Sequence, residues 1–279
     1  EYIHLGITAN GTPVDINKEV AKADRRICLG NIEYHYFAGY SGGAKAIMPG
    51  VSTRAAIQAN HSRMVEEEAR TGNIKTNPVR IDIDAVEKFV PIDFIVNVVL
   101  DSSKKIIKAV AGHYIDAHRE GCRFLDSFYK INIKEKADIV ITTPGGYPKD
   151  LNLYQAQKAL DNSKHAVKDG GIIILVASCK EGLGEKVFEQ WMLNFEKSED
   201  MIEEIKRNFQ LGGHKAAAIA MILKKAKIFL VSELEPDFVR SIFMEPFSDV
   251  QSAVDAAFNE KDDNAKVILM PFGGSTLPD

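Results

Sequence analysis

The chain has 279 residues, of which 45% are hydrophobic and 27% charged, a composition typical of a globular protein with one large domain or two of ordinary size. Its 35 basic and 39 acidic residues give a formal charge of −4 with no block of like charge, so we expect no nucleic-acid partner. No apolar run approaches the ~20 residues that cross a bilayer as a helix, so we expect no membrane partner.

The three cysteines, Cys28, Cys122 and Cys179, are an odd number at wide spacing. Such spacing argues against a disulfide framework and against a zinc site built from cysteines, and it fits a protein of the reducing cytoplasm. We expect all three to be small buried hydrophobic residues. The chain begins EYIHLGITANG without an initiator methionine, so we expect it to start inside a longer protein. A site shared with an upstream segment would then be incomplete here.

In the first half, RRICLGNI is predicted to form a strand that leads into a glycine-rich loop. Ser52 or Thr53 can cap a helix through AAIQANHSRMVEEEA, and Pro78 starts a second helix in NPVRIDIDAVEKF. The segment DFIVNVVLDSSKKIIKAVAGH has the pattern of two strands joined by a hairpin turn at Asp101-Ser102-Ser103. A third helix is predicted in HYIDAHREGCRFLDSFYKI.

The second half alternates short apolar runs, rich in β-branched residues, with segments of helical spacing. Such runs suit strands that are covered on both faces. The runs lie at 137–143, 170–178, 226–232 and 265–271, and the helical segments at 151–167, 186–195, 200–209, 214–225 and 250–259. This alternation predicts an α/β fold of two domains, the second a doubly wound, mostly parallel sheet with helices on both faces.

The change of pattern near residues 126–136 marks the domain boundary. We assign residues 1–130 to the remainder of an N-terminal α/β domain and 131–264 to a C-terminal α/β domain. Residues 265–279 are the last strand and tail, for which a return to the first domain is left open.

The segment GYSGGAKA places a lysine, Lys45, in a glycine-rich loop. A phosphate-binding loop would have glycine before this lysine and a hydroxyl residue after it, but the chain has Ala44 and Ala46, which disfavours that assignment. An exposed lysine in a flexible turn is the other alternative. The glycines at 39, 42 and 43 argue against it, because they let the backbone adopt positive φ and approach a ligand closely. Pro49-Gly50 then leads into a helix whose N-terminus could bind an anion.

Two histidines flank this lysine. His35 lies ten residues before it, and His61 lies sixteen residues after it, two turns or more into the predicted helix. A rigidly held neutral imidazole is a good ligand for nickel, copper or zinc. Either histidine by itself is equally consistent with a structural role.

This arrangement resembles that of the nickel-dependent lactate racemases and their 2-hydroxy-acid racemase and epimerase relatives. The shared pattern is H-x9-K-x15-H within H-x3-G-x-S-G-G-x-K-x3-P-G. The resemblance continues through GGYPKDLNLYQAQKAL and LGGHKAA, and so covers most of the chain. The matching residues are His35, Gly39, Ser41, Gly42, Gly43, Lys45, Pro49, Gly50 and His61.

The resemblance implies a covalent cofactor, a nickel-pincer pyridinium mononucleotide. Lys45 matches the lysine joined to its thioamide arm, His61 the histidine that binds nickel, and His35 one of two acid/base histidines beside the substrate. The other acid/base histidine belongs to an upstream segment, so the chain as given is expected to be inactive in racemisation. Because separate enzymes build the cofactor, protein from an ordinary expression host is expected to lack it.

These groups suit the inversion of a carbon beside a carboxylate. The α-proton of a hydroxy acid is weakly acidic, whereas removal of hydride, with a base taking the hydroxyl proton, gives a planar 2-oxo acid. Return of the hydride to the other face gives the opposite enantiomer. Histidine has a pKa near the operating pH without heavy perturbation, and the cofactor accepts the hydride.

A second cluster follows the predicted strand at 137–143. Asp150 or Asn152 can cap a helix there, and Gln155 and Lys158, three residues apart, share one face near its start. Open α/β sheets bind ligands at the carboxyl ends of their strands, where a cation, an amide and the helix dipole would hold a carboxylate or phosphate. A solvated helix face is the alternative. In the resembling family, Tyr154, Gln155 and Lys158 match residues that line the substrate pocket.

We therefore predict an isomerase, a racemase that interconverts the enantiomers of a short 2-hydroxy acid, most simply lactate. One alternative is a phosphate- or nucleotide-binding module without a covalent cofactor, in which Lys45 is a point charge. Another is an epimerase of a larger 2-hydroxy acid. The expected partners are a small-molecule 2-hydroxy acid and the cofactor-building enzymes. His214-Lys215, after two glycines, fits an anion-facing helix start, a packing role for Gly212-Gly213 fits equally well, and the pair is given no function.

Overall fold

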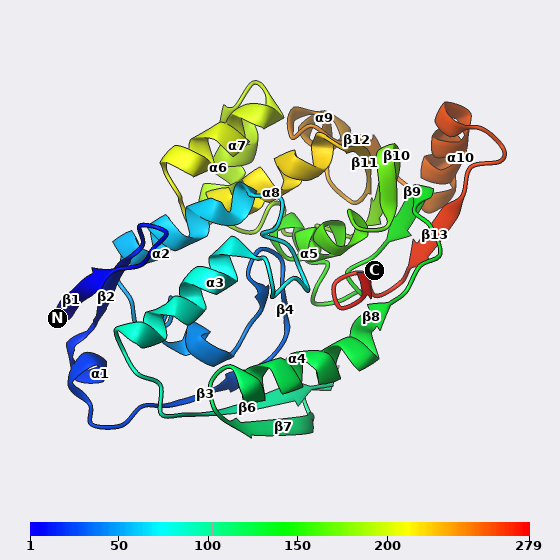
Figure 1. Ribbon diagram of the computed structural model, residues 1–279. Helices are drawn as coiled ribbons and strands as arrows, with labels where there is room; N and C mark the ends of the chain where they lie inside the picture. The colour runs from blue at the N-terminus through cyan, green and yellow to red at the C-terminus, as the bar shows by residue number, and fades with distance from the viewer. Residues whose placement is uncertain (102) are drawn as a thin grey trace. The chain divides into compact units, whose positions relative to one another are not determined.

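The computed structural model describes residues 1–101 and 103–279, and the chain divides into two units, Glu1–Tyr129 and Lys130–Asp279 (Figure 1). The first unit ends with the last residue of a 14-residue amphipathic helix, α4 (Asp116–Tyr129). Among the described residues, no helix has both the length and the apolar character needed to span a membrane. Each unit is described below by itself.

The first unit contains a three-stranded sheet of order β3–β6–β7, in which β3 runs parallel and β7 antiparallel to the central strand. Alternate residues of β6 are buried, among them Ile95, Asn97 and Val99, and α4 packs on β6 and β7. The predicted hairpin of β6 and β7 is confirmed, while Ser102 in its turn lies outside the described residues. The strands are β1 (Tyr2–Ile7), β2 (Pro13–Asn17), β3 (Ile27–Asn31), β4 (Tyr34–His35), β5 (Gly39–Tyr40), β6 (Phe94–Leu100) and β7 (Ile106–Gly112), and the other α-helices are α1 (Lys18–Lys22), α2 (Arg54–His61) and α3 (Pro78–Ala85).

Side chains cap both helices that follow the lysine loop. At the start of α2, Thr53 Oγ1 accepts a hydrogen bond from the N–H of Ala56 at 3.2 Å, and Asn77 caps α3 ahead of its first residue, Pro78. The sequence predicts one helix through residue 69, but α2 ends at His61 and a 3-10 turn follows. Continuation would place the glutamates at 66–68 at the negative C-terminal end of the helix dipole, which is unfavourable.

The second unit contains a five-stranded parallel sheet of order β12–β11–β10–β9–β13. Right-handed crossovers from β9 to β12 place α5, α8 and α9 on one face, and the return to β13 places α10 on the other (Figure 1). Ala253 and Ala257 of α10 pack on strand residues such as Ile172 and Phe229. The strands are β8 (Lys130–Ile131), β9 (Ala137–Thr142), β10 (Val167–Val176), β11 (Ala226–Val231), β12 (Glu245–Phe247), β13 (Val267–Met270) and β14 (Leu277–Pro278), and the helices are α5 (Leu153–Ser163), α6 (Lys186–Asn194), α7 (Ser198–Arg207), α8 (Gly213–Leu223), α9 (Pro236–Ser241) and α10 (Val250–Lys261).

The predicted α/β class and the parallel sheet with helices on both faces are confirmed. The C-terminal tail belongs to the second unit, because β13 pairs with β9 and β14 pairs with β8. Residues 265–279 are thus grouped with the second unit. The chain also forms short elements that the sequence did not indicate, namely the β1–β2 hairpin, α9 and β12.

Candidate functional site

The lysine loop runs from the β4–β5 hairpin into a single 3-10 turn, Gly43–Ala46. Two of its glycines combine a positive φ with a neighbour that leaves little room for a side chain. Gly39 has φ +76°, and a Cβ atom there would lie 2.1 Å from the carbonyl oxygen of Asn73. Gly43 has φ +61°, and a Cβ atom there would lie 3.0 Å from the ring of His118. The glycine pattern of the sequence thus reflects both a left-handed backbone and close packing against two other segments.

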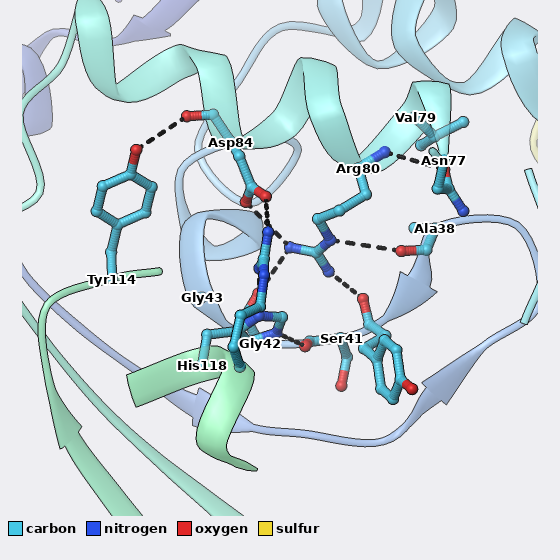
Figure 2. A network of polar contacts seen from close by, with 12 residues as sticks. Ala38, Ser41, Gly42, Gly43, Asn77, Val79, Arg80, Asp84, Tyr114 and His118 are labelled. Carbon is cyan, nitrogen blue, oxygen red and sulfur yellow. Dashed lines mark hydrogen bonds and ion pairs between the residues drawn. The ribbon is translucent and has the colours of Figure 1, made fainter. Parts of the chain in front are cut away.

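A buried arginine fixes the loop by hydrogen bonds to its backbone (Figure 2). Arg80 of α3 is fully buried, and its guanidinium donates to the carbonyl oxygens of Ala38 at 3.4 Å, of Gly42 at 3.3 Å and of Tyr40. Asp84, one turn further along α3, lies 3.6 Å from the guanidinium and balances its charge. Three alternate residues of the loop are therefore tied to one side chain.

A neutral histidine supports the same loop. The Nδ1 atom of His118 accepts from Arg119 Nη1 at 2.7 Å, so the ring proton lies on Nε2, which donates to the carbonyl oxygen of Ser41 at 2.7 Å (Figure 2). Burial, and then the charge of Arg80, lower the pKa of His118 to about 3. The sequence offered no motif for this residue, and the structure makes it part of the frame of the site.

Lys45 is half-buried, unlike an ordinary surface lysine. Burial, followed by the like charge of Arg80, lowers its pKa to about 8. Among the residues that the structure describes, none forms a side-chain hydrogen bond or an ion pair with Lys45. A desolvated lysine with a depressed pKa carries a substantial fraction of free amine near neutral pH, and the free amine is the nucleophilic form.

The two flanking histidines share an aromatic neighbour. The ring of Phe37 meets that of His35 edge to face at 4.6 Å between centroids, and that of His61 at 4.8 Å. His35 is half-buried, and its Nδ1 accepts from the N–H of Ala38 at 3.2 Å. The proton of the neutral His35 ring therefore lies on Nε2 in this arrangement, and a role as base at Nε2 requires the other tautomer.

His61 is buried at the end of α2, and its neighbour in sequence sets its tautomer. Asn60 Nδ2 donates to the carbonyl oxygen of Val79 at 3.2 Å and to Asp82 Oδ2 at 3.0 Å, which fixes the orientation of the amide. Asn60 Oδ1 then accepts from His61 Nδ1 at 2.9 Å. A neutral His61 consequently carries its lone pair on Nε2. A second hydrogen bond of this kind is the usual support of a metal-binding histidine.

The donor set suits a metal that an organic group also holds. Within residues 1–101 and 103–279, no three His, Cys, Asp or Glu side chains lie together as a set of metal ligands. One oriented imidazole, on the helix that follows the lysine loop, could bind a metal carried by a lysine-bound cofactor, because such a cofactor supplies the remaining ligands itself. His61 and Lys45 therefore fit the implied group.

The second unit holds the other predicted site residues at the start of α5. Asn152 caps this helix by accepting from the N–H of Gln155 at 3.0 Å. Gln155 and Lys158 are exposed on one face and Tyr154 is half-buried beside them. The helix follows β9, whose two neighbours, β10 and β13, are reached over opposite faces of the sheet. Such a switch point is where open α/β sheets bind ligands.

Lys215 supports this helix start. It is buried, its Nζ donates to the carbonyl oxygen of Tyr154 at 2.6 Å, and it lies 3.6 Å from the centroid of the Tyr154 ring. Burial, and then the charge of Lys158, lower the pKa of Lys215 to about 7. The preceding Gly213 has a packing role, because a Cβ atom there would lie 2.3 Å from the ring of Trp191. Sequence gave no basis for either contact.

His35, Lys45 and His61 thus belong to the first unit, and Tyr154, Gln155 and Lys158 to the second. Sequence reasoning missed the supporting roles of Asn60, Arg80 and His118, and it gave no function to Lys215, which lies in the segment LGGHKAA. The one available signal was the position of Asn60 directly before His61, since an amide at that place can reach the imidazole.

Two family models match the chain, the lactate racemase N-terminal domain over residues 1–72 and the lactate racemase C-terminal domain over residues 132–277. The chain is 37% identical to a lactate racemase of Thermoanaerobacterium thermosaccharolyticum, over 98% of this chain and 66% of that protein. It is 34% identical to a lactate racemase of Lactiplantibacillus plantarum, over 97% of this chain and 65% of that protein. The chain therefore spans slightly less than two thirds of these relatives.

Solved structures agree with the fold. The lactate racemase apoprotein of T. thermosaccharolyticum superposes with a TM-score of 0.93 at 36% identity, covering all of this chain and 68% of that one. A Thermotoga maritima protein superposes with a TM-score of 0.68 at 16% identity, covering 96% of this chain and 70% of that one. The second likeness concerns the fold alone.

Proposed function

The chain belongs to the lactate racemase family, and on that premise we propose that it carries part of the active site of a 2-hydroxy-acid racemase, an isomerase whose simplest substrate is lactate. The observation that carries the proposal is Lys45, a half-buried lysine of lowered pKa in a loop that two oriented histidines flank. A surface lysine would need none of this support.

In this proposal Lys45 is the covalent attachment point of a nickel-pincer pyridinium mononucleotide. His61, held by Asn60, binds the nickel through Nε2. When bound, this group supplies the acceptor and donor of the hydride. The frame around the loop contributes by keeping the attachment point and the imidazole in fixed positions, because a ligand placed on rigid elements loses little orientation.

His35 moves the proton of the substrate hydroxyl. The substrate becomes a planar 2-oxo acid when its hydroxyl proton and its hydride leave, and it regains both in the opposite configuration. For His35 to accept the proton at Nε2, its Nδ1 must become the protonated nitrogen, so the contact with the Ala38 N–H opens when substrate binds. The pKa of an ordinary histidine suits this exchange near neutral pH.

Lys158, Gln155 and Tyr154 orient the substrate. An ammonium and an amide on the exposed face of α5, near the positive end of the helix dipole, can hold a carboxylate by charge-assisted hydrogen bonds. Lys215 holds the backbone of Tyr154 from the buried side. The proposed location is the reducing cytoplasm, where buried free thiols such as those of Cys28, Cys122 and Cys179 persist.

The test is intact mass with metal analysis on protein co-produced with the cofactor-building enzymes. We expect a mass adduct and stoichiometric nickel in the wild type, and neither in Lys45→Ala. Lys45→Arg is the matched variant, because it keeps the charge but cannot form the covalent bond. Its loss of the adduct, with folding intact, supports the tether.

Two results would redirect the proposal. Wild-type protein without adduct or nickel would leave Lys45 as an anion-binding lysine and favour the phosphate- or nucleotide-binding module, which Lys45→Arg should partly preserve. A loaded full-length protein that leaves lactate unchanged but interconverts a longer 2-hydroxy acid in chiral chromatography would identify an epimerase or racemase of larger substrates.

A further inference from the structure

Arg80 is unusual because an arginine side chain is rarely buried completely. It is the largest fully buried side chain of the described residues, and an arginine is almost never fully buried unless its charge is paired and its donors are used. Among the residues that the structure describes, only the carboxylate of Asp84 lies near enough to form an ion pair with it, and Asp84 also pairs with Arg119. The remaining Arg80 contacts are backbone carbonyl oxygens.

Those carbonyl oxygens all belong to one short segment. They come from Ala38, Tyr40 and Gly42, so that the guanidinium spans the loop at every second residue up to three residues before Lys45 (Figure 2). The N–H of Lys45 in turn contacts the carbonyl oxygen of Gly42 at 3.3 Å. A single side chain of α3 thus determines where the lysine-bearing turn begins.

We propose that Arg80 is a positioning residue for Lys45: it fixes the loop from Ala38 to Gly42 and so presents the lysine amine for acylation. The inference rests on the proposed function, in which Lys45 is the attachment point of the cofactor. A hydrophobic residue would fill the same volume at lower cost, so a buried guanidinium indicates a requirement that packing alone does not meet.

The charge of Arg80 acts in the same direction as its hydrogen bonds. Besides burial, it is the group that lowers the pKa of Lys45 to about 8. About half of the Lys45 amine is then unprotonated at pH 8, whereas an exposed lysine is almost entirely protonated there. Position and charge together make Lys45 more reactive than the surface lysines.

The experiment measures that reactivity without the cofactor. The protein is treated with N-acetoxysuccinimide at pH 8: the lone pair of the lysine nitrogen attacks the ester carbonyl, N-hydroxysuccinimide leaves, and the ammonium proton passes to the buffer. Peptide mass spectrometry gives the acetylation rate of Lys45 relative to that of Lys75, an exposed lysine of the same unit. We expect Arg80→Gln to lower this ratio at least about two-fold, because removal of the like charge raises the pKa of Lys45 and so lowers its fraction of free amine at pH 8.

Arg26→Gln is the matched control. Arg26 also belongs to the first unit and donates to three backbone carbonyl oxygens, those of Val20 at 2.8 Å, of Ala21 at 2.7 Å and of Pro91 at 3.4 Å. Its loss should leave the Lys45 ratio unchanged. A folded Arg80→Gln protein with the wild-type ratio, or an equal fall in Arg26→Gln, would overturn the inference.

If Arg80→Gln does not fold, Asp84→Asn tests the role of Arg80 in its place. The variant keeps the shape and an acceptor but removes the carboxylate charge 3.6 Å from Arg80, so the positive potential at Lys45 increases. We expect the ratio at pH 7 to rise at least about two-fold; an unchanged or lower ratio counts against Arg80. A reactive, Arg80-dependent Lys45 that never gains a cofactor adduct would refute the proposed function instead.

Discussion

Neutral histidines carry much of the hydrogen bonding around the lysine loop. His118 can accept from Arg119 and donate to Ser41 only while it is uncharged, and protonation would add a positive charge beside two arginines. His214 is likewise buried at the start of α8, where its Nδ1 accepts from the N–H of Gly212 at 3.0 Å and its pKa is lowered to about 4. Each of these rings makes folding sensitive to acid.

Stability should therefore fall with pH in a defined window. His118 has a pKa of about 3 when folded, against about 6.5 unfolded, so between these values the unfolded chain binds more protons. The free energy of unfolding should decrease by up to about 1.4 kcal/mol for each pH unit lost to this one group. Urea unfolding of wild type and His118→Gln from pH 7 to pH 4 measures it.

The difference between the two proteins isolates His118, because His214 and the carboxylates remain in both. We expect the shallower pH dependence in His118→Gln. Identical slopes for the two proteins would mean that His118 is not the buried neutral ring described above.

At the scale of an element, the lysine loop depends on backbone that only glycine adopts without strain. Gly39→Ala should destabilise the first unit, since it combines a positive φ with a Cβ atom 2.1 Å from a backbone oxygen. Gly11→Ala is the matched control, because Gly11 has φ +85° but no atom within 4 Å of its added Cβ. The control should cost about 1–2 kcal/mol, and Gly39→Ala at least about 2 kcal/mol more.

Chemical denaturation of both variants checks this prediction. Equal losses in the two proteins would indicate that strain in φ, and not the approach of Asn73, explains the glycine at 39. A lysine loop that tolerates alanine at position 39 would also weaken the case that its shape is set by its neighbours.

The elements themselves were largely predictable from the sequence. Apolar β-branched runs located β9, β10, β11 and β13 to within a few residues, because strands covered on both faces have continuous apolar sequence. Asn152 and Thr53 were among the predicted caps. The end of α2 at His61 was not predicted, since apolar spacing continues past it and only the charges of the following glutamates oppose the helix.

At the scale of the whole molecule, the first and last strands of the second unit pair with strands of the same unit. Its first strand, β8, pairs with its last, β14, and β13 completes the sheet beside β9. Residues 130–279 expressed alone should therefore unfold cooperatively in urea with a mixed α/β circular dichroism spectrum. Residues 130–264 should not, because they leave the β9 edge unpaired and lose the buried Met270 and Leu277.

Cooperative folding of the shorter fragment would contradict this assignment. Association of residues 265–279 with the first domain would then become the hypothesis to test. A non-cooperative longer fragment would mean that the second unit depends on the first for its stability.

The sequence by itself determined the α/β class, the order of the main strands and helices, and the pattern of one lysine between two histidines in a glycine-rich loop. These features are local, since they depend on residue type and spacing along the chain. Only the tertiary structure decided that Lys45 is desolvated beside Arg80, that Asn60 sets the tautomer of His61, and that His118 is neutral. The partners that orient these groups lie 19 residues away for Asn60 and Val79 and 77 residues away for His118 and Ser41, and such separations leave no periodicity in the sequence.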